Sequence, residues 1–525
     1  MGSEGRPVNL GLADTRPTPR ELFLLAALPA ILLLLNLGGM PLFDVDEGAF
    51  SEATREMFSR GDFISTWLNG EPRFDKPILI YWLQAIPFHF LGASEWSFRL
   101  PSALAAIVWC VAVGRFAWPR FGREAGQLAA LVAATSLGVF VIGRAATADS
   151  LLNCLLTLAM TDAWRHLESN RKAPLYRMFL WIGLGVLTKG PIAIAIPAAV
   201  TLLYCASRGE WGRFFRASLN PVGWAILLVV ALPWYVAIYM IHGQAFIDGF
   251  IMKHNVGRFS GPMEGHGGSL FYYVIIVPVL LLPWTAPLIR ALGEARSDAS
   301  EPLRRFLWIW FGFVLVFFSL SGTKLPHYAL YGCTPLFLLV ALHRERLQHR
   351  WLAFVPPLLL LVFLAALPTL FEYALVSGRV ADPYYAAQLA RTPQVAGWAY
   401  PVATLASLAL AIAVALWRSQ PAWRRLAFIA AIQGVLLAAV VGPFVGELLQ
   451  GPVKRAALVA RAHGGPAVQW NFFQPSFAVY RGQEAPAREP AVGELALTRF
   501  DRLPADAHVE TLFAQGGVRL VKRIQ

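Results

Sequence analysis

An acidic cluster, Asp44-Val45-Asp46-Glu47, directly follows the first long apolar stretch of the chain. Carboxylates at the end of a membrane span are costly to keep near lipid, so they mark functional sites more often than they support the fold. A carboxylate that is partly withdrawn from water can accept a proton from a hydroxyl group. We therefore predict that Asp46 is a catalytic base. The alternative role is helix capping, which is the preferred interpretation for Asp44.

Several cations are predicted to face the same side of the membrane as this cluster. Lys76 lies in Phe74-Asp75-Lys76-Pro77, and Lys189, Arg258 and Lys324 each lie in a short polar segment between apolar stretches. Taken singly, an ion pair between Asp75 and Lys76, or snorkelling of Lys189 and Lys324 toward headgroups, would explain them. Taken together they predict a site for a lipid-linked phosphate, because a positive charge binds phosphate strongly where the dielectric is low.

The composition indicates which elements hold these residues. Hydrophobic residues make up 57% of the chain and charged residues 15%, and the apolar stretches recur at lengths that cross about 30 Å of hydrocarbon. The net charge of +13 does not indicate nucleic acid, because Lys and Arg form short clusters between apolar stretches, as expected of cytoplasmic loops. The four cysteines lie in separate apolar stretches without CxxC spacing, so neither a disulfide framework nor a thiolate metal site is expected. The sequence predicts a polytopic α-helical membrane protein.

We predict about thirteen membrane-spanning helices from the apolar stretches. The segment 78–91 is short and is interrupted by Gln84, Pro87 and His89, so it is expected to lie along the interface. With the N-terminus inside, every cytoplasmic loop then carries arginine, and the acidic cluster, the candidate cations and the C-terminus face outward. The predicted spans are 21–39, 98–117, 126–143, 149–164, 178–188, 190–206, 222–241, 270–290, 306–320, 327–342, 353–370, 398–417 and 426–443.

The chain is predicted to divide into a transmembrane domain, 1–450, and a small soluble α/β domain, 451–525, on the outer face. The second domain is predicted from a helical pattern at 453–461, a strand-like segment at 467–480 and short apolar segments near 495–498 and 518–521. The catalytic loops of the first domain are expected at 40–97, 143–149, 242–269 and 321–328.

The order of the motifs resembles that of the polyprenyl-phosphate-dependent GT-C glycosyltransferases, a family that includes the lipid A aminoarabinose transferases and the protein O-mannosyltransferases. The resemblance covers about the first 340 residues and implies a GT-C fold. The resembling elements are Asp46-Glu47, Glu52 to Met57, Gly61-Asp62-Phe63, Leu68-Asn69-Gly70, Phe74-Asp75-Lys76-Pro77 with Tyr81-Trp82, Gly143-Arg144 to Asp149, Leu187 to Gly190, His254 to Phe259 and Lys324 to Tyr328.

The resemblance also implies roles for particular residues. Asp46 matches the proposed base and Asp149 a second acidic residue, while Lys76, Lys189, Arg258 and Tyr328 match the groups around the donor phosphate. Asp75 and His254 match a metal pair, which would hold a divalent ion such as Zn or Mg. No Gly-rich nucleotide-binding loop stands between a strand and a helix, so no nucleotide cofactor is expected.

These observations predict an enzyme of the bacterial inner membrane whose active site faces the periplasm. It would pass a monosaccharide, with inversion, from a polyprenyl (undecaprenyl) phosphate to a hydroxyl of lipid A or LPS, a polysaccharide or a protein. The alternative is a polyprenyl-lipid transporter or flippase with the same cationic site and no transfer chemistry. A transporter needs a polar path across the bilayer, whereas the candidate charges stop at one face.

Overall fold

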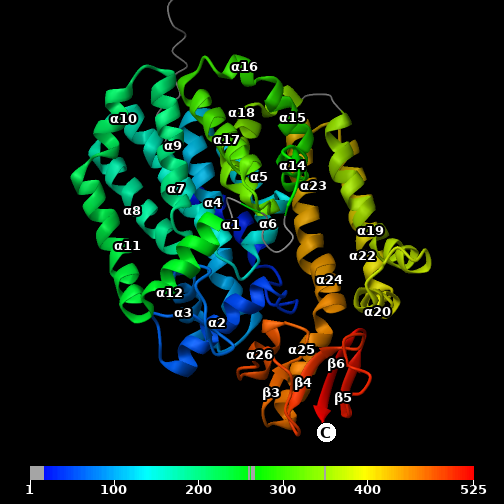
Figure 1. The fold of residues 1–525 in the computed structure, drawn as a ribbon. Helices are drawn as coiled ribbons and strands as arrows, with labels where there is room; N and C mark the ends of the chain where they lie inside the picture. The colour runs from blue at the N-terminus through cyan, green and yellow to red at the C-terminus, as the bar shows by residue number, and fades with distance from the viewer. Residues whose placement is uncertain (1–16, 258–260, 262–266, 348–350) are drawn as a thin grey trace, which may run out of the picture.

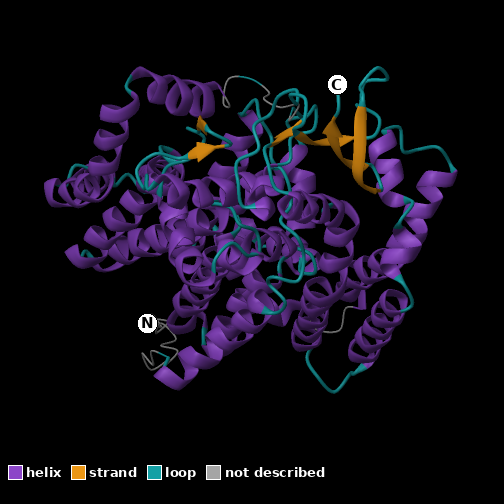
Figure 2. Cartoon of the chain, turned by 90° about the horizontal axis from the view of Figure 1, so that it is seen from below, coloured by secondary structure: helices purple, strands orange, loops and turns teal. Residues whose placement is uncertain are grey.

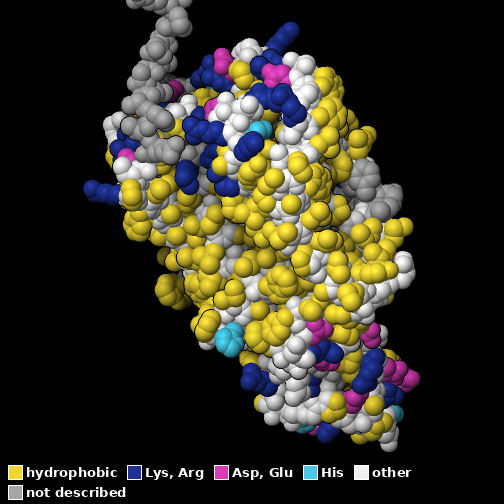
Figure 3. All heavy atoms as spheres, turned by 90° about the vertical axis from the view of Figure 1, so that its left-hand side faces the viewer, with side chains coloured by type: hydrophobic (Ala, Val, Ile, Leu, Met, Phe, Trp, Pro, Cys, Tyr) yellow, Lys and Arg dark blue, Asp and Glu magenta, His cyan; other side chains and the backbone are white. Residues whose placement is uncertain are grey.

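The computed structural model describes residues 17–257, 261, 267–347 and 351–525, and within them helices form one large bundle (Figure 1). In this part of the chain, six helices or continuous helical runs are long and apolar enough to cross a membrane. Hydrophobic side chains form a broad band around the visible face of the bundle, and charged side chains gather at its two ends (Figure 3). The chain is thus a polytopic helical membrane protein. The six are α4 (Glu95–Phe121), α11 (Pro221–His242), α17 (Pro302–Leu320), the runs Trp351–Val376 and Ala422–Leu449, and α22 (Ala399–Leu416).

A seventh candidate is bent. Helices α5 (Arg123–Thr135) and α6 (Leu137–Gly143) occupy the predicted span 126–143 and meet at an angle of 64°. The break lies at Ser136, where the amide of Leu137 donates to the carbonyl of Leu282 instead of continuing the helix. The sequence did not indicate this bend because Leu282 is distant in the chain.

Helices occupy the other predicted spans as well, although several are short. The segment 78–91 forms α3 (Leu79–Leu91), whose apolar side chains Ile86, Phe90 and Leu91 are exposed. The predicted span 270–290 is divided into two helices, α14 and α15. The remaining elements of the bundle are α1 (Pro19–Leu34), α7 (Asp149–Ser169), α8 (Lys172–Lys189), α9 (Ile192–Ser207), α10 (Trp211–Ser218), α12 (Gln244–Phe246), the π-helix η1 (Ile247–Gly257), α14 (Tyr272–Leu280), α15 (Thr285–Gly293), α16 (Ala295–Asp298), the 3₁₀ helix η2 (Pro326–Gly332), α18 (Thr334–Leu342), η3 (Arg344–Leu347), η4 (Trp351–Phe354), α19 (Val355–Val376), α20 (Pro383–Leu389), α21 (Thr392–Ala396), α23 (Ala422–Leu436), η5 (Leu437–Val441) and α24 (Gly442–Leu449).

One end of the bundle carries a polar helix, α2 (Asp46–Arg60), followed by a small hairpin of β1 (Trp67–Leu68) and β2 (Glu71–Pro72). Helix α2 ends at Gly61, which adopts the left-handed conformation (φ +66°) that terminates helices. The hairpin turns at Asn69-Gly70, where both residues have positive φ, the sequence pair most suited to a two-residue turn. These elements bring the loop 40–97 over the end of the bundle (Figure 1).

The last 75 residues form a four-stranded sheet with two helices (Figure 2). The strand order is β3-β4-β6-β5, with β3 and β4 parallel and the other pairs antiparallel. The prediction of a strand over 467–480 is wrong beyond residue 469, because Pro475 begins a helix, where its missing N–H costs nothing. The elements are α25 (Gly451–His463), β3 (Ala467–Gln469), α26 (Pro475–Arg481), β4 (Leu495–Arg499), β5 (Val509–Gln515) and β6 (Val518–Arg523).

This C-terminal unit packs against the end of the bundle that carries α2. The carboxylate of Asp44 accepts hydrogen bonds from the amide of Ser476, at 2.9 Å, and from its hydroxyl. Asp44 therefore binds the start of α26, and its predicted role as the cap of α2 is wrong, because α2 has no side-chain cap. Tyr480 adds a second link, since its Oη accepts from the amide of Leu42 at 2.7 Å and donates to Glu95 at 2.8 Å.

The Asp44 contact predicts a pH dependence of stability. Burial raises the pKa of Asp44 to about 7 from 3.8, and the hydrogen bonds from Ser476 offset it only in part. Between these values the folded protein holds a proton that the unfolded chain has released, so the contribution to stability falls as pH rises from about 4 to about 7. We expect Asp44→Asn to flatten this part of the profile of thermal midpoint against pH. An unchanged profile would contradict the assignment, and Asp506→Asn, at an exposed position, is the control.

Candidate active site

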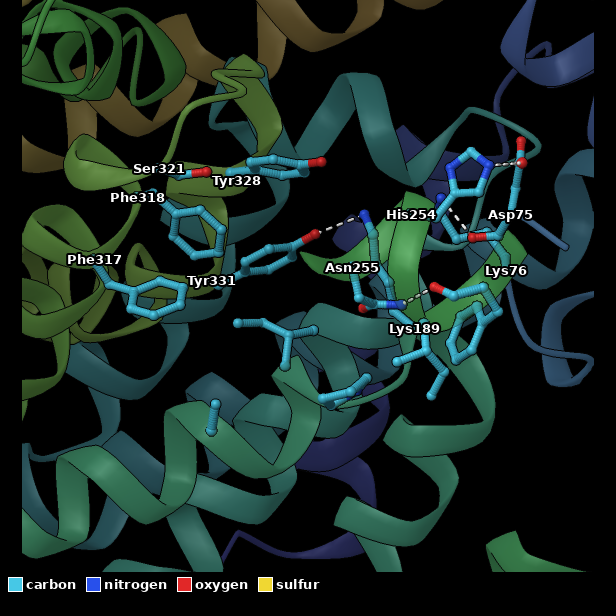
Figure 4. Close-up of a pocket in the computed structure, with 15 residues that line it drawn as sticks. Asp75, Lys76, Lys189, His254, Asn255, Phe317, Phe318, Ser321, Tyr328 and Tyr331 are labelled. Atoms are coloured by element: carbon cyan, nitrogen blue, oxygen red, sulfur yellow. Dashed lines mark hydrogen bonds and ion pairs between the residues drawn. The ribbon is translucent and has the colours of Figure 1, made fainter. Parts of the chain in front are cut away.

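A cavity of about 480 Å³ lies at the α2 end of the bundle, between the end of α8, the start of α9, η1, α17 and η2. Its two sides differ in character (Figure 4). Asp75, Lys76 and His254 lie on one side, and Phe317 and Phe318 lie on the other. The cavity therefore suits a ligand with a charged head and an apolar chain.

A group of four side chains centres on Asp149, the first residue of α7. Lys189 Nζ forms an ion pair with Asp149 and donates to Tyr331 Oη at 2.7 Å, and Tyr331 Oη donates to Asp149 Oδ1 at 3.1 Å. His327 Nε2 lies 3.5 Å from the same carboxylate oxygen. Lys189 also lies over the rings of Tyr328, at 5.3 Å, and Tyr331, at 5.5 Å from the ring centroids. Asp149 thus holds the ammonium group of Lys189 at the cavity wall.

Asp75 and His254, the predicted metal pair, lie in direct contact. His254 Nε2 is 2.7 Å from Asp75 Oδ1, and Arg73 Nη2 is 3.1 Å from Asp75 Oδ2. Burial alone would raise the pKa of Asp75, but the His254 hydrogen bond and the charge of Arg73 outweigh it and hold the pKa well below its ordinary value. Asp75 is therefore ionised. No third His, Cys, Asp or Glu completes a metal-binding group with this pair within the described ranges.

Asp46 differs from Asp149 in its surroundings. It is the first residue of α2, its side chain is exposed, and it makes no hydrogen bond or ion pair with any other residue that the structure describes. Asp46 does not line the cavity, but its negative charge favours the charged forms of Arg73 and His327, an effect smaller than that of their burial. Of the two carboxylates, Asp46 is therefore the one that is exposed to solvent.

The other residues that were predicted to bind phosphate differ in whether they line the cavity. Lys76 and Tyr328 line the cavity, and Lys76 Nζ donates to the carbonyl of Asp75 at 3.1 Å. Lys324 is buried, and its Nζ donates to the carbonyl of Ser321 at 2.7 Å, so it supports its own loop. Arg258 lies outside the described residues. The structure brings Lys76, Lys189 and Tyr328 to one cavity.

The main positioning contact of the site is an ion pair that the sequence did not predict. Glu47 Oε2 lies 2.7 Å from Arg99 Nη2, and both side chains are buried. Glu47 also accepts from the amide of Phe43 at 2.8 Å and from that of Ala146 at 2.7 Å. Glu47 therefore connects the start of α2, where Asp46 lies, to α4 and to the loop before Asp149. The available signal was Arg99 itself, a charge inside the predicted span 98–117.

Comparison with known proteins gives concordant results. The profile of the dolichyl-phosphate-mannose-protein mannosyltransferase family matches residues 75–236. An undecaprenyl phosphate-alpha-4-amino-4-deoxy-L-arabinose arabinosyl transferase of Edwardsiella ictaluri is 29% identical over 331 residues, which cover 62% of this chain and 59% of the relative. The corresponding transferase of Serratia proteamaculans is 30% identical over 332 residues, covering 61% of this chain and 59% of the relative. The chain thus matches about three fifths of the length of these relatives.

Solved structures show the same fold. The structure of ArnT from Cupriavidus metallidurans bound to undecaprenyl phosphate superposes with a TM-score of 0.79 at 20% identity, covering 95% of this chain and 97% of that one. The apo oligosaccharyltransferase of Archaeoglobus fulgidus superposes with a TM-score of 0.52 at 12% identity, covering 89% and 64%. These findings confirm the predicted similarity to the GT-C glycosyltransferases, with the aminoarabinose transferases among the matches.

Proposed function

From this similarity and the site geometry, we propose that the protein is a glycosyltransferase that takes a monosaccharide from a polyprenyl phosphate, such as undecaprenyl phosphate, and passes it to an acceptor hydroxyl with inversion. One observation carries the proposal. A single cavity is lined by Lys76 and Lys189 and, on its other side, by Phe317 and Phe318. A lipid-linked phosphate sugar has this division between a charged head and an apolar chain.

The cations supply the main catalytic effect. When the glycosidic bond to the donor breaks, negative charge develops on the departing lipid phosphate, and preorganised cations in a low-dielectric site stabilise that charge. Lys76 and Lys189 bind the phosphate, and Tyr328 lies in the cavity wall beside it. We assign Arg258 to the same phosphate site because it lies in the motif His254 to Phe259. Asp149 acts through Lys189, which it orients toward the cavity.

Asp46 serves as the general base in this proposal. Its carboxylate takes the proton of the acceptor hydroxyl as the oxygen attacks the anomeric carbon, and the bond to the phosphate breaks on the opposite face of the sugar, which inverts its configuration. The acceptor is an envelope molecule, either lipid A or LPS, a polysaccharide or a protein. Mass spectrometry of envelope glycolipids and glycoproteins from cells with and without the gene tests this. Loss of one sugar from one class identifies the acceptor, and identical profiles contradict the proposal.

We further propose that about thirteen helices cross the inner membrane of a bacterium, with the active site and the C-terminal unit in the periplasm. All four native cysteines are buried, so a single introduced cysteine can be labelled selectively. We expect an impermeant thiol reagent to label Glu489→Cys from the periplasm of intact cells and to label Arg123→Cys only after lysis. Both side chains are exposed. Labelling of position 123 in intact cells would mean that α3 crosses the membrane.

Asp75 and His254 are also proposed to hold a divalent metal ion, Zn or Mg, whose charge would help to neutralise the donor phosphate when bound. The two donors fit such an ion only in part, because they contact each other directly and the other ligands would come from the phosphate and water. We expect the purified protein to contain about one such ion per chain, and Asp75→Asn to lose it together with most activity. Full activity after chelation would contradict the metal assignment and leave the phosphate site unaffected.

A further inference from the structure

A second and larger cavity, of about 890 Å³, lies at the opposite end of the bundle from the candidate active site. Its lining residues come mainly from α1, α4, α7 and α8. Asp149 begins α7, whereas Asp162 and Glu168 of this cavity lie in its second half. At 1.5 Å per residue, Asp162 lies roughly 20 Å and Glu168 roughly 28 Å along α7 from Asp149, so the two sites are separated by most of the thickness of the hydrocarbon core.

The cavity is strongly positive. It is lined by five arginines and two carboxylates, a surplus of three positive charges. The arginines come from different segments of the chain, so the fold and not the local sequence brings them together. They are Arg115 and Arg120 of α4, Arg165 of α7, Arg171 of the following loop and Arg177 of α8.

Part of this charge is held in fixed positions. The buried carboxylate of Asp162 pairs with Arg165 at 2.9 Å and with Arg177 at 2.8 Å, so one carboxylate orients two guanidinium groups. Arg115 and Arg171 are exposed, and their side chains form no hydrogen bond or ion pair within the residues that the structure describes. Guanidinium groups with free donors are the preferred partners of phosphate oxygens.

The cavity also has an apolar wall that a soluble anion would not use. Leu158 and Trp181 line it about one helical turn deeper into the bundle than Asp162 and Arg177, respectively. Helix α10 contacts the same end of α7, since Arg213 donates to the carbonyl of Leu167, and its exposed Trp211 and Phe215 are typical of a helix at the membrane surface. The arginines therefore stand at headgroup level, and the apolar wall stands where acyl chains begin.

The geometry points to a binding site for the phosphate group of an anionic phospholipid at this end of the bundle, which the positive-inside pattern assigns to the cytoplasmic leaflet. The arginines take the phosphate oxygens, and Leu158 and Trp181 contact the first acyl carbons. The inference is independent of the proposed transferase activity, since it involves a separate cavity.

Native mass spectrometry of the full-length protein in detergent tests this site. The probes are phosphatidylglycerol, phosphatidylcholine, glycerophosphoglycerol and inorganic phosphate. We expect the double variant Arg115→Ala/Arg171→Ala to lose about 30-fold in affinity for phosphatidylglycerol, because it lacks two of the arginines that attract the anionic headgroup. The matched control is Arg216→Ala/Arg418→Ala, which removes two exposed arginines outside the cavity and is expected to keep its affinity.

Four results would overturn the inference. The first is an unchanged affinity in the double variant, and the second is an equal loss in the control, which would indicate a general effect of surface charge. Equal binding of phosphatidylcholine would exclude selection for an anionic lipid. Equal binding of glycerophosphoglycerol or inorganic phosphate would show that the cavity takes a soluble anion. Arg115→Lys keeps the charge and is expected to retain most of the affinity, which separates charge loss from misfolding.

Discussion

Replacing Asp46 by Asn is expected to lower sugar transfer by about 10²- to 10⁴-fold, the contribution typical of a general base. The amide cannot take the proton of the acceptor hydroxyl, but it has nearly the same size as the carboxylate. Asp46 is exposed and makes no hydrogen bond or ion pair within the described ranges, so the replacement leaves the fold intact. The measurement compares the turnover of purified wild type and variant at saturating donor, together with their affinity for the donor.

The matched control is Asp248→Asn, which removes an exposed carboxylate from η1 at the same end of the bundle. It is expected to keep wild-type turnover. Near-normal turnover of Asp46→Asn would overturn the assignment and make Asp149 the candidate base. Asp149 would then have to act while paired with Lys189 and Tyr331.

Lys76→Ala is expected to cost about 2 to 4 kcal/mol of transition-state stabilisation, as does removal of one preorganised donor from an anion site. Lys189→Ala and Arg258→Ala are expected to show losses of similar size. Lys76 gives the cleanest test, because loss of Lys189 also leaves the Asp149 carboxylate without its ion pair. Lys76→Arg should recover part of the activity, since the phosphate requires charge first and donor geometry second.

The control for Lys76 is Lys253→Ala, an exposed lysine of η1 outside the cavity wall. Steady-state kinetics with donor and acceptor varied separately distinguish two explanations. Weaker use of donor supports the phosphate assignment. Normal use of donor with a lower affinity for acceptor would show that the cations bind an anionic acceptor, such as a phosphorylated glycolipid.

The sequence predicted the helices of the bundle well because membrane spans depend on local apolar length, which any stretch displays by itself. It failed where distant residues decide the geometry. The bend between α5 and α6 depends on a hydrogen bond to Leu282, and Asp44 binds Ser476, more than 400 positions away. The helix over 475–481 was missed because its apolar residues also fit a strand pattern, although Pro475 was a usable start signal.

For the candidate site, the sequence indicated which side chains carry charge but not how they pair. Lys76 and Lys189 were predicted from their position at the ends of apolar stretches, and both line one cavity. The ion pair of Lys189 with Asp149 and the buried pair of Glu47 with Arg99 join residues 40 and 52 positions apart. Spacing gives no signal for such pairs, so the distinction between engaged Asp149 and open Asp46 came only from the structure.

The most direct test of the account is transfer by the purified protein in liposomes. The donor is undecaprenyl phosphate that carries a radiolabelled sugar, and an envelope extract supplies the acceptors. We expect label to leave the polyprenyl lipid and to appear on an acceptor with inverted anomeric configuration. Asp46→Asn and Lys76→Ala are expected to lower this transfer by the factors given above, and Asp248→Asn is expected to leave it unchanged. Label that stays on the polyprenyl lipid but moves across the bilayer would contradict this expectation and would identify a transporter.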